Sequence, residues 1–148
     1  MVVRPMNWRC KIMGKENIKG TVIIVEDDMI ISLVVGIIVE KLGFKVVANA
    51  DNGVDAVNKI KEHKPDVVVM DMSLNGKLDG IETVNRIRSF SNVPVIYISG
   101  HSDQQHISRA KETGFVDYLV KPVSRDEMIL SMEKAIKKDG EYYFNQAS

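Results

Sequence analysis

Acidic, hydroxyl and ammonium side chains stand directly after short apolar runs at several points of this chain. One run ends at Glu26 and Asp27, a later one at Asp71, and two more at Ser99 and Lys121. Carboxylates held close together raise one another's pKa values, and a hard dication such as Mg²⁺ relieves their repulsion. If these runs end at one edge of a sheet, their side chains form a candidate Mg²⁺ site.

The same side chains could support phosphoryl transfer. Asp71 could attack phosphorus as a nucleophile and form an acyl phosphate. The metal, the Lys121 ammonium and the Ser99 hydroxyl could then bind the phosphoryl oxygens as charge develops on them. The sequence offers neither a base–nucleophile pair for acyl transfer nor a GxxxxGK loop for nucleotide phosphates. Phosphoryl transfer to a carboxylate is therefore the chemistry that fits this set.

Five strand–helix units are expected to position these residues. Short apolar runs rich in β-branched residues predict strands that are buried on both faces. The predicted strands are Thr21–Val25, Lys45–Ala48, Asp66–Met70, Pro94–Ile98 and Val116–Val120. The predicted helices are Asp27–Leu42, Asn52–His63, Leu78–Arg88, Ser102–Thr113 and Ser124–Lys138. Ser124 is the expected N-cap of the last helix, with Glu127 completing a capping box.

This alternation predicts an α/β fold, a doubly wound five-stranded parallel sheet of flavodoxin-like order 2-1-3-4-5 with helices on both faces. In such sheets, sites lie at the carboxyl ends of the strands, near the switch point between strands 1 and 3. We expect residues 1–19 to be an unstructured or cloning-derived N-terminal tail, residues 20–138 to be the domain, and residues 139–148 to be a C-terminal tail.

Composition excludes some functions and leaves others open. The chain has 148 residues, with 20 basic and 20 acidic side chains and zero net charge. This balance gives no electrostatic reason to expect direct nucleic-acid binding or attraction to an anionic membrane. The single cysteine, Cys10, cannot form an internal disulfide, and no apolar segment of signal-peptide length is visible. A cytoplasmic location is the expectation.

Four motifs in order give the chain a recognisable pattern. They are VEDD at 25–28, PDVVVMDMSLNGKLDGIE at 65–82, VPVIYISG at 93–100 and DYLVKP at 117–122. From about Thr21 to Lys138 the chain resembles the receiver domain of bacterial and archaeal two-component response regulators. Each motif alone is a weak signal, whereas all four at these spacings are specific.

The resemblance implies a role for each matching residue of the site. Glu26 and Asp27 correspond to the acidic pair that holds Mg²⁺, and Asp71 corresponds to the phosphoacceptor, which also binds the metal. Ser73 corresponds to the position whose backbone carbonyl is a further metal ligand. Mg²⁺ is the cofactor that this set implies.

The resemblance also implies a switch. Ser99 corresponds to the hydroxyl residue that moves to bind the phosphoryl group, and Tyr118 to the aromatic residue that rotates with it. Lys121 corresponds to the family's lysine, and a cis peptide bond is expected between it and Pro122. Phosphorylation would reshape the face formed by the fourth helix, fifth strand and fifth helix.

Two positions depart from the commonest family pattern. The first acid is Glu26, where many members have aspartate, which shifts only the metal contact. The loop after Asp71 is one residue longer than the commonest form and carries Asn75 where proline is frequent. This version resembles receivers that are joined to sensor-kinase or PAS modules.

The first helix has an unusual pattern. Apolar residues at helical spacing predict a core-facing side formed by Ile31, Val34, Val35, Ile38 and Leu42. Leu33 and Ile37 then fall on the outer side, where exposed apolar residues favour a partner surface. A dimer contact, or simple tolerance of exposed apolar residues, is the alternative for this face.

The expected function is Mg²⁺-dependent acceptance of a phosphoryl group on Asp71 from a histidine kinase or phosphotransfer domain. The output would be a protein contact, with a downstream partner or a second copy. The chain is not expected to be an enzyme beyond its own phosphorylation and dephosphorylation. The alternatives are a phosphotransferase of the haloacid dehalogenase type, which usually has an acid where Ser73 stands, and a degenerate receiver used only for docking.

Overall fold

The computed structural model describes residues 18–100 and 104–137. The strands are β2 (Gly20–Val25), β3 (Phe44–Ala50), β4 (Val67–Asp71), β5 (Val95–Ser99) and β6 (Asp117–Val120). The helices are α1 (Met29–Lys41), α2 (Gly53–His63), α3 (Gly80–Arg88), α4 (Gln104–Thr113) and α5 (Arg125–Ala135). Most of the predicted N-terminal tail, all of the C-terminal tail, Cys10 and the predicted helix start at Ser102 lie outside the described residues.

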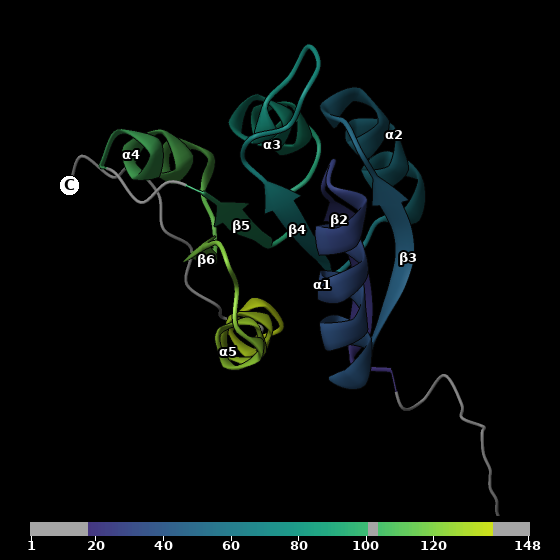
Figure 1. Cartoon of the computed structure of the whole chain (residues 1–148). Helices are drawn as coiled ribbons and strands as arrows, with labels where there is room; N and C mark the ends of the chain where they lie inside the picture. The colour runs from purple at the N-terminus through teal and green to yellow at the C-terminus, as the bar shows by residue number, and fades with distance from the viewer. Residues whose placement is uncertain (1–17, 101–103, 138–148) are drawn as a thin grey trace, which may run out of the picture.

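The five strands form one parallel sheet in the order β3-β2-β4-β5-β6. Counted along the chain, this is the predicted order 2-1-3-4-5, and the predicted fold class is confirmed. Figure 1 shows helices on both sides of the sheet. Buried residues of α2, α3 and α4 share one core cluster, while those of α1 and α5 belong to the other.

The strands β2, β4 and β5 are buried on both faces because their side chains alternate between these two clusters, whereas the edge strands β3 and β6 are partly exposed. In β2, Ile23 and Val25 belong to one cluster while Val22 and Ile24 belong to the other. All five residues of β4 and all five of β5 are buried. This burial explains why the sequence shows continuous apolar runs there instead of polar alternation.

Two helices begin later than the sequence predicts, because an aspartate caps each of them. Asp28 accepts hydrogen bonds from the amides of Ile30 and Ile31, so α1 begins at Met29 and not at Asp27. Asp79 accepts one from the amide of Glu82 in a capping box, so α3 begins at Gly80 and not at Leu78. Asp27 is therefore left in the loop before α1, where its carboxylate is available to a site.

The last helix has the capping that the sequence predicts, but it is shorter than predicted. The predicted capping box of Ser124 and Glu127 is present, and the peptide bond between Lys121 and Pro122 is cis, as expected. Helix α5 ends at Ala135 instead of continuing to Lys138. Within the described ranges, no helix is long and apolar enough to cross a bilayer.

The orientation of α1 was predicted correctly only in part. Leu33 and Ile37 are 65% and 47% exposed, as expected for its outer side. The prediction was wrong for Val34, which is 48% exposed, and it left out Val39, which is fully buried. Val35 and Val39, four residues apart, form the buried line of the helix.

Candidate metal and phosphoryl-transfer site

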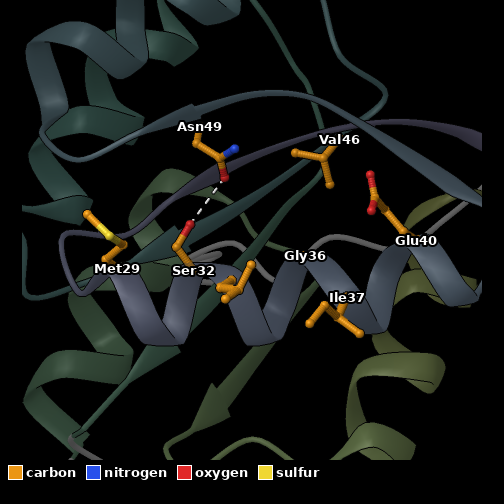
Figure 2. A pocket seen from close by; sticks show the side chains of 8 residues that line it. Met29, Ser32, Gly36, Ile37, Glu40, Val46 and Asn49 are labelled. Carbon is orange, nitrogen blue, oxygen red and sulfur yellow. Dashed lines mark hydrogen bonds between the residues drawn. The ribbon is translucent and has the colours of Figure 1, made fainter.

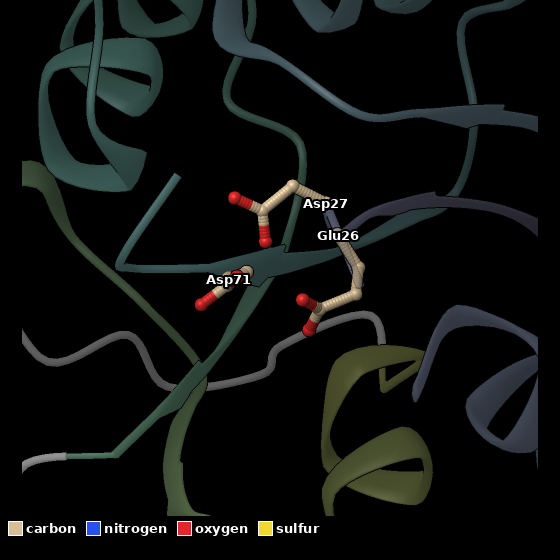
Figure 3. Close-up of side chains that lie close together, drawn as sticks. All are labelled: Glu26, Asp27 and Asp71. Atoms are coloured by element: carbon tan, nitrogen blue, oxygen red, sulfur yellow. The ribbon is translucent and has the colours of Figure 1, made fainter. Parts of the chain in front are cut away.

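Three carboxylates meet at the carboxyl ends of β2 and β4. One oxygen each from Glu26, Asp27 and Asp71 lie within 4.8 Å of one another (Figure 3). The parallel register pairs Val25 with Met70, so the residue that follows each partner comes to the same edge of the sheet. The topology brings together acids that are separated by more than 40 positions, as the switch-point rule predicts.

The Glu26 carboxyl is held in an unfavourable environment for its charge. Its residue is 5% exposed, and Asp71 is 2% exposed. The pKa of Glu26 is raised to about 7, mainly by burial and then by the hydrogen bond and the negative charge of Asp71. The amide of Asp28 and the ammonium of Lys121 act in the opposite direction. Such a site gains from any added positive charge.

Lys121 supplies positive charge at this point. Its Nζ lies 3.4 Å from Oε1 of Glu26 and 3.4 Å from Oδ1 of Asp71. Partial burial alone would lower the pKa of the ammonium, but the two carboxylates outweigh that effect and raise it. Lys121 therefore remains charged beside the proposed phosphoacceptor over the physiological pH range.

Ser99 and Ser73 also lie at this end of the sheet. Ser99 is the last residue of β5 and is fully buried, and its carbonyl accepts a hydrogen bond from the amide of Lys121 at 2.7 Å. Ser73 is exposed, and its amide donates to Oδ1 of Asp71 at 3.0 Å. The roles assigned to the Ser99 hydroxyl and the Ser73 carbonyl stay predictions.

Tyr118 lies in an aromatic group with Tyr97 and Phe115. Its ring centroid is 6.4 Å from that of Tyr97 and 6.0 Å from that of Phe115. Tyr97 is fully buried, and its hydroxyl lies 2.6 Å from the Thr113 hydroxyl near the end of α4. Tyr118 itself is only partly buried in β6. The group therefore connects β5, β6 and α4, which belong to the predicted switch region.

The donor set fits a hard dication. Within the described residues, the one group of side chains close enough to hold a metal ion consists of these three carboxylates. Oxygen ligands of this kind suit Mg²⁺, which binds through one or a few carboxylates and keeps several waters. An adjoining cavity, of about 290 Å³, is lined by Glu26 and Asp27 together with residues of α1, β3 and α2.

The sequence did not identify two features that shape the site. The amide of Asn75 donates a hydrogen bond to Oδ2 of Asp27 at 3.1 Å. A Cβ at Gly80 would collide with the backbone carbonyl of Asp71 and with Cα of Met72, so α3 can pack this closely only with glycine there. The contact made by the Asn75 amide has no signal in the sequence, because a backbone N–H does not depend on the type of side chain. The close packing at Gly80 did have one, the glycine of the DG pair at 79–80.

A groove beside the acids runs along α1. It has a volume of about 380 Å³, and its lining includes Leu33, Gly36, Ile37 and residues of β3. Figure 2 shows the Ser32 hydroxyl donating a hydrogen bond to Oδ1 of Asn49, at 3.1 Å, between α1 and β3. Ser32 and Asn49 also line the cavity that contains Glu26 and Asp27. The apolar face of α1 is thus continuous with the acidic site.

Comparison with known proteins gives matches over most of the chain. The family model for the response regulator receiver domain matches residues 22–133. The chemotaxis protein CheY of Bacillus subtilis is 34% identical over 116 residues, which cover 78% of this chain and 96% of CheY. The transcriptional regulatory protein PdtaR of Mycobacterium tuberculosis is 32% identical over 117 residues, which cover 79% of this chain and 57% of PdtaR. The chain therefore matches little more than half the length of that regulator.

Solved structures show the same similarity. The signal receiver domain of a modulated diguanylate cyclase from Desulfovibrio desulfuricans has a TM-score of 0.74 and 38% identity, over 79% of this chain and 93% of that one. A CheX–CheY–BeF3–Mg²⁺ complex from Borrelia burgdorferi matches with a TM-score of 0.75 and 29% identity, over 80% of this chain and 90% of the other.

Proposed function

This chain belongs to the response regulator receiver domain family of two-component systems, and on that premise we propose that it accepts a phosphoryl group on Asp71 in the presence of Mg²⁺. The observation that supports this proposal is the meeting of three carboxylates within 4.8 Å, with the Lys121 ammonium 3.4 Å from two of them. Receiver domains act as signalling phosphoacceptors, and Asp71 is the carboxylate that ends the central strand β4.

In this proposal Asp71 is the nucleophile. One of its carboxylate oxygens forms a bond to phosphorus while the bond from phosphorus to the donor's imidazole nitrogen breaks. The electron pair of that bond stays with the imidazole, which takes up a proton. Lys121 keeps an ammonium beside Asp71, where negative charge increases. A bound Mg²⁺ would be held by Glu26, Asp27, Asp71 and the Ser73 carbonyl, and would neutralise charge on the carboxylates and the phosphoryl oxygens.

The donor in this proposal is a histidine kinase or a phosphotransfer domain. The open cavity at Glu26 and Asp27 and the exposed apolar residues of α1 lie side by side, so one partner helix could contact both. An apolar face next to an acidic, reactive centre suits a protein donor more than a small metabolite. We assign the first contact with the donor to Leu33 and Ile37.

The output in this proposal is a change of the face formed by α4, β6 and α5. The Ser99 hydroxyl would bind a phosphoryl oxygen, and Tyr118 would change its packing against Tyr97 and Phe115. A downstream protein or a second copy of the chain would then bind the changed face. Phosphorylation would act by shifting the population of two existing arrangements.

Beryllofluoride with Mg²⁺ tests the assignment of Asp71, because it mimics a phosphoryl group on a carboxylate. We expect it to shift the amide resonances of Ser99 and Tyr118 in NMR spectra of the wild-type chain and to leave Asp71→Asn unchanged. Glu133→Gln, which removes a charge from the exposed side of α5, is the matched control and should respond like wild type. A full response by folded Asp71→Asn would contradict the assignment.

The chain is less suited to a haloacid dehalogenase type of phosphatase. Such enzymes usually carry a general acid two residues after the nucleophilic aspartate. That position is Ser73, whose hydroxyl is not acidic enough to protonate a leaving group in its place. We therefore propose signalling through the phosphorylated state and not turnover of a substrate.

A further inference from the structure

Each carboxylate of the acidic cluster accepts a hydrogen bond from a backbone amide. Two of these bonds are local in sequence. Oε2 of Glu26 accepts from the amide of Asp28 at 3.1 Å, and Oδ1 of Asp71 accepts from the amide of Ser73 at 3.0 Å. In both cases the donor lies two residues beyond its acceptor, so the turn that follows each strand is enough to hold the carboxylate.

The third bond is different because its donor is remote in sequence. Oδ2 of Asp27 accepts from the amide of Asn75, 48 residues away, at 3.1 Å. Asp27 lies in the loop between β2 and α1, whereas Asn75 lies in the loop between β4 and α3. The orientation of the Asp27 carboxylate therefore depends on the conformation of the second loop.

The second loop is anchored directly before Asn75 by a buried side chain. The side chain of Leu74 is 7% exposed and belongs to the core cluster under α2 and α3. Gly76 has a φ of +104°, a conformation that glycine adopts readily. The side chain of Asn75 is exposed between them. The amide thus has a fixed position, while the asparagine side chain points into solvent.

We propose that Asn75 is a positioning residue for the metal site, acting through its backbone N–H on Asp27. The bond keeps one oxygen of Asp27 occupied by a neutral donor and leaves the other available for Mg²⁺. Proline, which is frequent at this place in receivers, has no N–H and could not make this contact. The inference rests on the proposed Mg²⁺-dependent function, and it gives Asn75 the role of ordering a metal ligand.

Two substitutions distinguish the role of the Asn75 backbone N–H from the role of its side chain. Asn75→Ala keeps the N–H and removes only an exposed side chain, so its affinity for Mg²⁺ should equal that of wild type. Asn75→Pro removes the N–H and should weaken Mg²⁺ binding roughly tenfold, as expected when an outer partner of a metal ligand is lost. The measurement is an NMR titration of each protein with MgCl₂ alone, following the amides of Asp27 and Asp28.

A variant with an ester bond in place of the amide bond at position 75 provides a second test if the proline variant does not fold. It is introduced as lactic acid, which differs from Asn75→Ala only by an oxygen in place of the N–H. The ester should show the same weakened Mg²⁺ affinity with an unchanged fold. Equal Mg²⁺ affinity in the ester and alanine proteins would overturn the inference about Asn75. A wild-type chain that binds no Mg²⁺ would instead refute the proposed function.

Discussion

Burial and the neighbouring carboxylate of Asp71 both raise the pKa of Glu26. The pKa of Glu26 is about 7 in the folded protein against 4.5 for an ordinary glutamate. A raised pKa means that the folded state binds this proton more tightly than the unfolded state does. The stabilising contribution is thus complete below pH 4.5 and is lost as the pH rises through about 7, a loss of up to about 3 kcal/mol.

We therefore expect the free energy of unfolding of the metal-free chain to fall between pH 5 and pH 8. Urea titrations at a series of pH values in EDTA measure it. Glu26→Gln, which cannot titrate, should have a flatter profile over the same range. Added MgCl₂ should stabilise the wild-type chain more at pH 8 than at pH 5.5, because the dication competes with the proton for the carboxylate. Identical profiles for the two proteins would contradict the assigned pKa.

The residues of the site were largely predictable from sequence, because each one carries a functional side chain at the end of an apolar run. Glu26, Asp27 and Asp71 were predicted as a cluster, and the structure brings their oxygens together. Lys121 was predicted beside them and lies there. The amide of Asn75 could not be predicted, since any residue except proline supplies an N–H and only the loop conformation directs it.

At the scale of elements, Arg88 at the end of α3 connects three segments of the chain. Its Nε donates to the carbonyl of Thr113 at 2.8 Å and Nη2 to that of Gly114 at 2.9 Å, both at the end of α4. Its Nη1 donates to the carbonyls of Ser91 and Val93, just before β5, at 3.3 and 2.7 Å. The guanidinium thus satisfies carbonyls that helix and strand hydrogen bonds leave open.

Removing this guanidinium should destabilise the fold without changing the acidic cluster of Glu26, Asp27 and Asp71. We expect Arg88→Met to lower the free energy of unfolding by about 3 kcal/mol, because several partly buried carbonyls lose a charged donor at once. Urea unfolding measures the change, and Arg86→Met, at an exposed position of the same helix, serves as the control. A loss no larger than in Arg86→Met would show that water replaces these bonds.

The elements themselves were predictable, whereas their ends and orientations were only partly so. Continuous apolar runs located all five strands, but Asp28 and Asp79 were placed inside helices that they in fact cap. The misplacement of Val34 has a different cause. From Met29 to Val39 only Ser32 and Gly36 interrupt the apolar residues, so no polar stripe indicates which side of α1 faces water. Packing against β2, β3 and α5 decides it.

At the scale of the whole molecule, the site and the exposed side of α1 depend on different parts of the fold. The acids are held by the ends of β2 and β4 and by their loops. The outer side of α1, with Leu33 and Ile37, contributes nothing to either core cluster. The proposed chemistry at Asp71 and the proposed recognition of a protein donor should therefore be separable by mutation.

Leu33→Glu tests this separation. Leu33 is 65% exposed, so the added charge should leave the fold and phosphorylation by acetyl phosphate close to wild type. Transfer from a histidine phosphotransfer protein that phosphorylates the wild-type chain should fall about tenfold, because the charge must be desolvated in the complex. Leu130→Glu, on α5 and 59% exposed, is the matched control. An equal loss with acetyl phosphate and with the phosphotransfer protein would show that Leu33 affects phosphorylation itself. No loss with either donor would show that the protein donor binds elsewhere than α1.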